Sequence, residues 1–320
     1  MPSTTVSVSA RRQPSPALRR FAWGVLAYFV AVILWGTLVR ATGSGAGCGD
    51  HWPLCNGTVM QHDPHTATII EFTHRLTSGI SFFAIVGLMI WTLVSTAKGH
   101  IARATAAASA IFTLVEAILG AMLVLLGLTA QSHSPLRPWY LALHLSNTLL
   151  LLAALTLTAH MLGRREGYLW SSIRMRALGG NLSALLVVMA VGVTGSLAAL
   201  GDTLFPATSL SQALSSDFSS KSAWLVRWRW THPAIAFLAA LAVFWILLRA
   251  MRNSSHWDNR SLSALVLGLL ATQYVLGIMD VIWLAPAWLQ VAHLLGADAL
   301  WCALIVLTAR QTFEPAPAHD

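Results

Sequence analysis

The chain has 320 residues, of which 56% are hydrophobic and only 10% are charged. Soluble domains have a charged share of about a quarter, so this composition excludes an ordinary soluble globular protein and indicates a protein embedded in a membrane. The formal net charge is +8. That charge would suit a nucleic acid partner, but the positions of the basic residues favour another explanation.

Eight apolar stretches are each long enough to cross a bilayer, which takes about 20 residues of helix. In chain order we expect transmembrane helices over 21–40, 70–94, 104–128, 139–161, 178–199, 230–249, 262–284 and 288–309. The first stretch is longer than a usual signal-peptide core and no clear small-residue cleavage site follows it, so we expect it to be retained. Residues 1–20 are predicted to form a disordered basic tail and residues 311–320 a second tail.

The basic residues are distributed unevenly between the two sides of this predicted arrangement. If the N-terminus is cytoplasmic, 14 of the 20 Lys and Arg residues fall in inner segments, and the outer side keeps Arg40, Arg75, Arg137, Lys221, Arg227 and Arg229. Cytoplasmic segments of membrane proteins carry such an excess. The charge therefore predicts a multi-pass protein of the cell (inner) membrane, with cytoplasmic N- and C-termini and no nucleic acid partner.

The second half of the chain repeats landmarks of the first half. The segment "WYLALHLSNTLLLLAAL" aligns with "WLQVAHLLGADALWCAL", and "EFTHRLTSG" aligns with "RWTHPAIAF". Residues 21–162 and 163–310 are therefore predicted to form two four-helix bundles. Because each half has an even number of helices, the halves are parallel repeats rather than inverted ones, which disfavours a transporter. The aligned pairs include His74 with His232, His144 with His293, and Glu116 with Gln273.

Four histidines lie within about the first two turns of helices that enter the membrane from the outer face: His74, His144, His232 and His293. Ionisable residues inside a membrane are costly and usually functional. The simpler reading of any one of them is a hydrogen bond to a neighbouring backbone carbonyl. Four at one depth, paired by a repeat, instead predict two sites where histidines from two helices bind one ligand. Glu116 is interpreted as a helix–helix hydrogen-bonding group rather than a catalytic one.

Two imidazoles from facing helices narrow the choice of metal. A catalytic zinc commonly has three protein ligands, and only Glu71 is available to supplement a pair. Copper stays an alternative, because imidazole suits it. Haem iron fits better, since imidazoles take both axial positions and helical bundles commonly enclose such groups. Haem propionates need cations, which the outer side offers as Arg40 and Arg75 in the first half and Arg227 and Arg229 in the second.

Two of the three cysteines, Cys48 and Cys55, fall in the first outer loop, "GSGAGCGDHWPLCNG". This loop is on the oxidising side of a bacterial membrane, where disulfides form. Closing so short a loop is sterically feasible, so we predict a disulfide, the alternative being two free thiols.

The sequence resembles the haem A synthase family at this loop, at "EFTHRLTSG" and at the three later histidine segments, over residues 21–309. The resemblance implies oxidation of the C8 methyl group of haem O to the formyl group of haem A, by successive hydroxylations and loss of water. It implies that the first half holds the substrate haem between His74 and His144. The second half would hold a haem b cofactor (iron-protoporphyrin IX) between His232 and His293, which relays electrons.

Two features depart from the family pattern. Some relatives carry a second cysteine pair between the fifth and sixth helices, and residues 200–229 contain none. The second half also reads His232-Pro233 where the first reads His74-Arg75. The haem contacts of the two halves therefore need not mirror each other.

Two interpretations of the role of Glu71 are consistent with the sequence. In one, the segment Thr68 to Glu71 is a capping box at the start of a helix. In the other, Glu71 acts on the bound ligand, because it lies three residues before His74 and both side chains share a helix face. The family's Glu-x-x-His motif favours the second reading, and we predict that Glu71 is catalytic.

The leading hypothesis is a haem-modifying oxidase, an enzyme that acts on haem O. The alternatives are a two-haem membrane cytochrome for electron transfer, and a haem carrier or assembly factor without oxidase activity. Expected partners are membrane lipid, a haem O synthase, terminal oxidase assembly proteins and an electron donor that the sequence does not identify.

Overall fold

The computed structural model describes residues 14–59, 64–130, 132–163, 173–253 and 257–313. Within these ranges, eight helices are long and apolar enough to cross a membrane, which confirms the predicted all-α membrane architecture. They are α1 (Pro16–Ala41), α2 (Thr66–Ser95), α3 (Ile101–Leu125), α4 (Arg137–Leu162), α5 (Met175–Leu204), α8 (Thr231–Asn253), α9 (Trp257–Ile282) and α10 (Ala287–Thr312).

The first helix begins earlier than predicted. Ser15 is its N-cap, and the Ser15 side chain accepts a hydrogen bond from Leu18 N at 3.2 Å. Pro16 follows, and proline is favoured at the first position of a helix because it lacks an N–H that would be unpaired there. The predicted tail over residues 1–20 is therefore wrong for 16–20. Residues 1–13 and 314–320 of the two predicted tails lie outside the described residues.

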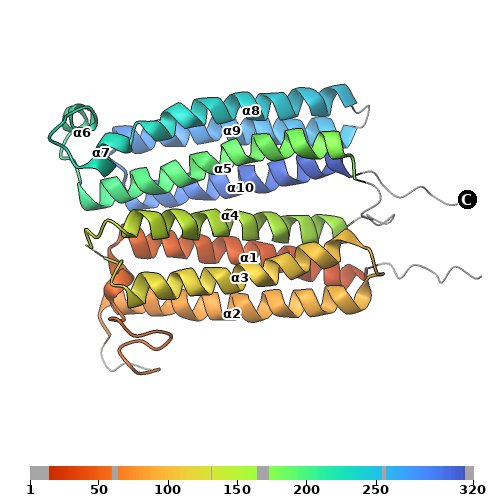
Figure 1. The fold of residues 1–320 in the computed structure, drawn as a ribbon, viewed down its shortest axis with the longest axis horizontal. Helices are drawn as coiled ribbons and strands as arrows, with labels where there is room; N and C mark the ends of the chain where they lie inside the picture. The colour runs from red at the N-terminus through yellow and green to blue at the C-terminus, as the bar shows by residue number, and fades with distance from the viewer. Residues whose placement is uncertain (1–13, 60–63, 131, 164–172, 254–256, 314–320) are drawn as a thin grey trace, which may run out of the picture.

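The long helices form two groups that lie side by side (Figure 1). One group contains α1 to α4, and the other contains α5, α8, α9 and α10. Helix α1 begins and α10 ends at the same end of the bundle. We call the opposite end, where the segment 42–59 connects α1 toward α2, the disulfide end.

Helices α4 and α10 join the two groups. Trp301 Nε1 donates a hydrogen bond to Leu149 O at 2.9 Å, and Thr156 donates to the sulfur of Cys302 at 3.3 Å. Leu149 and Trp301 belong to one buried apolar cluster that spans both groups. Where burial of this apolar surface removes contact with water, it contributes a favourable free energy of about 25 cal/mol per Å². In lipid, close packing of the side chains stabilises the association of the helices.

Two short helices, which the sequence did not predict, precede α8 at the disulfide end: α6 (Leu210–Asp217) and α7 (Trp224–Trp228). Arg229 holds this segment on α5, because its guanidinium binds Asp217 of α6 and Asp202 of α5, both at 2.7 Å. The segment between α5 and α8 is thus a fixed cover over this end of the second group.

Candidate functional site

The four predicted histidines all lie toward the disulfide end, each within about three turns of the start of its helix. His74 lies on α2, His144 on α4, His232 on α8 and His293 on α10. Each group of helices therefore contains one pair. Among the described residues no cluster of three or more His, Cys, Asp or Glu side chains could hold a metal ion, so each candidate site is built on a histidine pair.

Every one of these histidine rings faces a glycine on a neighbouring helix. The Cε1 atom of each histidine ring lies close to the position that a Cβ would occupy on the facing glycine. The distances are 3.0 Å for Gly36 and His74, 3.9 Å for Gly120 and His144, 2.9 Å for Gly195 and His232, and 3.4 Å for Gly277 and His293. A side chain at three of the four glycines would crowd the ring, so the glycines create the room that the rings occupy.

The pair in the second group has the spacing of two ligands to one metal ion. The ring centroids of His232 and His293 are 6.4 Å apart and the ring planes are at 87°. With metal–nitrogen bonds of about 2.0–2.1 Å, two imidazoles that share one ion have centroids roughly 6 Å apart. His232 Nδ1 lies 3.1 Å from Val191 O, and such a bond fixes the tautomer and leaves Nε2 for a metal.

The pair in the first group has different surroundings. His144 Nδ1 lies 3.3 Å from Oε1 of Glu116 on α3. Oε2 of Glu116 accepts a hydrogen bond from Asn147 Nδ2 at 2.5 Å, and Thr148 donates to Oε1. The predicted helix–helix role of Glu116 is thereby confirmed, but its contact with His144 was not predicted. Nδ1 of His74 and Nδ1 of His144 are both buried without a hydrogen-bond partner in the described part of the chain, so Glu116 approaches His144 as an ion-pair contact.

The sequence contained a signal for the contact between Glu116 and His144. Glu116 lies four residues before Gly120, so both share one face of α3, and the facing glycine places His144 against that face. In the second group Gln273 is aligned with Glu116, and it packs on the backbone of α10 instead. With its amide oriented to satisfy both neighbours, Gln273 donates to His293 O and accepts from Ala297 N, each at 3.1 Å.

The predicted disulfide between Cys48 and Cys55 is confirmed. Its loop rests directly on the start of α2, where a Cβ on Gly47 would lie 2.4 Å from the carbonyl carbon of Ala67. Thr68 also donates to Gly47 O at 2.7 Å. The disulfide loop therefore covers the first turn of the helix that carries His74.

Glu71 and Arg75 bind this loop from the same helix. Glu71 is 3% exposed, and its Oε2 accepts a hydrogen bond from Cys48 N at 2.8 Å. Arg75 donates to Glu71 Oε1 at 2.5 Å and to the carbonyls of His51 and Leu54 at 2.5 and 2.8 Å. The buried carboxylate of Glu71 and the partly buried guanidinium of Arg75 thus hold the loop against α2 beside His74.

The capping-box reading of Glu71 is wrong. Helix α2 begins at Thr66 with His65 as its N-cap, so Thr68 lies within the helix and its hydroxyl bonds to the loop. The sequence pattern failed because the segment before Thr68 is itself helical. Glu71 therefore satisfies the backbone of the disulfide loop and not the helix end.

The four arginines predicted to face propionates have distinct surroundings. Arg40 crosses between the two groups, donating to Thr203 and Ala199 O on α5, each at 3.0 Å, and to Gln290 on α10 at 2.6 Å. Arg227 is exposed on α7. Arg75 binds Glu71 and the disulfide loop, and Arg229 binds Asp202 and Asp217.

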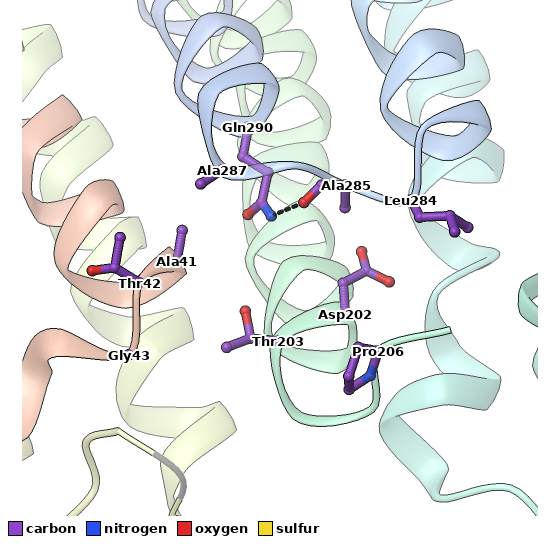
Figure 2. A pocket seen from close by; sticks show the side chains of 10 residues that line it. All are labelled: Ala41, Thr42, Gly43, Asp202, Thr203, Pro206, Leu284, Ala285, Ala287 and Gln290. Atoms are coloured by element: carbon purple, nitrogen blue, oxygen red, sulfur yellow. Dashed lines mark hydrogen bonds between the residues drawn. The ribbon is translucent and has the colours of Figure 1, made fainter. Parts of the chain in front are cut away.

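A cavity of about 270 Å³ lies beside Arg40 where the two groups meet at the disulfide end. Figure 2 shows that it is bounded by the end of α1, the end of α5 and the connection between α9 and α10. Gln290, which accepts from Arg40, also donates to Ala285 O at 2.6 Å at its edge. The cavity lies between the two groups of helices, and none of the four histidines lines it.

The sequence model of a family described as cytochrome oxidase assembly protein matches residues 19–305. The chain is 26% identical to the haem A synthase of Bacillus pumilus over 303 residues, which is 89% of this chain and 94% of that protein. It is 26% identical to the haem A synthase of Geobacillus kaustophilus over 325 residues, or 95% of each chain.

A further relative is a protohaem IX farnesyltransferase of Thermus thermophilus. The chain is 42% identical to it over 299 residues, which is 91% of this chain but 48% of that protein. The chain therefore spans about half the length of this relative.

Proposed function

Because the chain belongs to the haem A synthase family of cytochrome oxidase assembly proteins, a multi-pass membrane family, we propose that it oxidises haem O to haem A. The change is from the C8 methyl group of haem O to a formyl group. The chain would be an oxidoreductase whose product serves terminal oxidases.

The observation that carries this proposal is a chemical difference between two similar halves. Both halves have a histidine pair that faces glycines. In the alignment of the halves, however, Glu71 corresponds to Arg229 and Glu116 corresponds to Gln273. The first half thus has two carboxylates near its histidines where the second has a cation and an amide. An electron relay needs no such groups, whereas oxidation of a methyl group requires proton transfer.

We assign the substrate haem O to His74 and His144 in the first half, and haem b to His232 and His293 in the second. The spacing of the second pair supports an iron held between its two rings, and the facing glycines leave room for the histidine rings of both pairs. When bound, haem b would supply one-electron transfer toward the substrate site. The apolar helices around both pairs would keep water from the reacting methyl group.

Glu71 is the proposed catalytic carboxylate. It is held in place by Cys48 N–H and Arg75, so its orientation is fixed before substrate binds. From this position it would accept a proton as the methyl group is oxidised, an effect typically worth 10² to 10⁴ in rate. The disulfide loop would form the outer rim of the substrate site, because the same contacts hold it on α2.

The propionates of the two haems would be neutralised by Arg40 and Arg75 in the first half and by Arg227 and Arg229 in the second. Arg227 is exposed and available for such a contact. Arg40, Arg75 and Arg229 already bind other groups. Each would use a remaining N–H for a propionate or exchange a present partner for it, so these three are weaker candidates for propionate binding than Arg227.

The proposed placement in the membrane follows from the charge distribution. Both termini would be cytoplasmic, the halves would be parallel repeats, and the haem sites would lie toward the outer face of the cell membrane. The disulfide at the same end as the histidines supports this orientation, because disulfides form on the oxidising side.

The expected partners follow from the reaction. A haem O synthase would deliver the substrate, and the Thermus relative, named as a protohaem IX farnesyltransferase, supports a link between the two modifications of haem. Proteins of terminal oxidase assembly would receive the product.

The proposal is tested with the purified full chain, supplied with haem O, oxygen and a chemical reductant. Chromatography of the extracted pigments should show haem A, or a hydroxylated intermediate followed by haem A. Recovery of unmodified haem O, from protein that retains bound haem b, would favour electron transfer or haem carriage instead.

A further inference from the structure

Glu116 is a carboxylate in the middle of a membrane-spanning helix, where charge is costly unless it is paired. Its side chain is 17% exposed. Asn147 and Thr148 of α4 both donate hydrogen bonds to it, and Asn147 also donates to Phe112 O at 2.8 Å. These donors favour the ionised form and fix the direction of the carboxylate.

The fixed carboxylate faces one particular atom of His144. Its Oε1 lies 3.3 Å from Nδ1 of that ring, which is ion-pair distance, although the two groups are not aligned as a hydrogen bond. A nitrogen that faces a carboxylate carries the proton, so the other nitrogen, Nε2, is left with its lone pair free. Gly120, on the same helix face as Glu116, also faces the ring, whose Cε1 atom lies 3.9 Å from the position of a Cβ on that glycine.

The second half of the chain provides an internal comparison. There Nδ1 of His232 faces a neutral backbone carbonyl, Val191 O, at 3.1 Å. The residue aligned with Glu116 is Gln273, which bonds to the backbone of α10 and not to the His293 ring. Among the described residues, only the first half thus pairs a candidate ligand histidine with a carboxylate.

From this difference we infer that Glu116 is a positioning residue for the substrate haem. It presents Nε2 of His144 to the iron and makes this imidazole a stronger electron donor than the histidines of the second half. A carboxylate behind a ligand histidine raises its basicity, so Glu116 would distinguish this imidazole from the histidines that would hold haem b. The inference rests on the proposed function, because it assigns the substrate haem to His74 and His144.

The experiment compares the reduction potentials of the haems bound to the purified full chain, in wild type and in Glu116→Gln. The second-half signal is identified by its loss in His293→Ala. Glu116→Gln keeps the shape and one accepting oxygen toward α4, but it removes the charge and the second accepting oxygen. We expect the first-half potential to rise, the second-half potential to stay the same, and the affinity of the first half for iron-protoporphyrin IX to fall about 10- to 100-fold.

Two further variants separate positioning from packing. Glu116→Asp retains a carboxylate and should restore most of the wild-type potential. Asp298→Asn is a control for a general change in the bundle, because Asp298 is another acidic side chain buried in the bundle, 2% exposed and on α10. Its loss should leave the first-half potential unchanged.

An unchanged first-half potential and affinity in Glu116→Gln would overturn the inference and leave Glu116 as a helix–helix contact. Equal shifts of both haems would also overturn it, since they would report a general change in the bundle. If the first-half potential shifts as expected but wild type makes no haem A, the positioning role stands and the proposed function fails. If wild type makes haem A and Glu116→Gln shows no shift, only the positioning role fails.

Discussion

The ring of His232 fills the space where Gly195 lacks a side chain, with its Cε1 atom 2.9 Å from the position of a Cβ on that glycine. A methyl group at that distance would force the ring or the helix to move. The same relationship recurs between His74 and Gly36, where the distance is 3.0 Å. Glycines therefore determine where the candidate ligand histidines can lie. Substitution of one glycine by alanine, which adds a single methyl group, tests this relationship.

We predict that Gly195→Ala displaces His232 and sharply lowers the b-type haem absorbance of the purified protein. His232→Ala and His293→Ala should have at least as large an effect, because each removes a ligand. The measurement is the reduced-minus-oxidised spectrum per mole of protein. Gly268→Ala is the control, since no atom lies within 4 Å of a Cβ at Gly268. An unchanged spectrum in Gly195→Ala and in both histidine variants would contradict the assignment of haem b to this site.

The second prediction concerns Glu71→Gln. This variant keeps the shape of the side chain but loses the charge that Cys48 N–H and Arg75 bind. We expect normal insertion and a near-normal haem b spectrum, with haem A formation reduced by a factor of about 10² to 10⁴ and haem O or a hydroxylated intermediate accumulating. Pigment chromatography measures this ratio. Wild-type amounts of haem A would limit Glu71 to holding the disulfide loop.

The third prediction concerns the loop itself. Cys48→Ser with Cys55→Ser removes the covalent link, but the contacts from Glu71 and Arg75 remain. We therefore expect the protein to fold and to keep haem b, with weaker retention of haem in the first half. Thiol labelling of native membranes, before and after reduction, provides the check on wild type. Two cysteines that label without reduction would show that the bridge does not form.

The fourth prediction is a pH dependence at the opposite end of the bundle. His100 caps α3 by accepting a hydrogen bond from Ala102 N at Nδ1, 3.1 Å away. Burial lowers the pKa of His100 below its usual value of 6.5, and the nearby charge of Arg103 lowers it further. The neutral imidazole is thus the form that the folded protein favours.

The sign of the effect follows from this lowered pKa. Above pH 6.5 both the folded and the unfolded chain hold His100 neutral, and its contribution to stability is complete. As the pH falls below 6.5 the unfolded chain is protonated first, so stability decreases until the folded pKa is passed. His100→Asn keeps a cap without a titrating group, and its thermal unfolding in detergent should depend less on pH than that of wild type. Equal pH profiles would contradict this account.

Much of this arrangement was predictable because it depends on local chemistry. The apolar stretches, the spacing of Cys48 and Cys55 and the four histidines at helix starts all follow from single segments of sequence. The repeat also pointed to the correspondence of Glu116 with Gln273.

The remaining features depend on how helices are rotated against one another. The approach of Glu116 to His144 depends on how α3 and α4 are rotated against each other. The ion pairs of Arg229 require α6, a short helix with only modest apolar character, to bring Asp217 within reach of the same guanidinium as Asp202 of α5. Thr68 was wrongly predicted as a cap, because its hydroxyl donates to Gly47 O of the loop instead of accepting from the helix N–H groups that follow it.

The central claim is that the chain converts haem O to haem A. Its most direct test is pigment analysis of membranes from cells that express the chain together with a haem O synthase and contain no other haem A synthase, with Glu71→Gln as a matched control. The account predicts haem A in the wild-type membranes and little in the control. Haem O as the sole modified haem in both, from protein that is inserted and binds haem b, would contradict it.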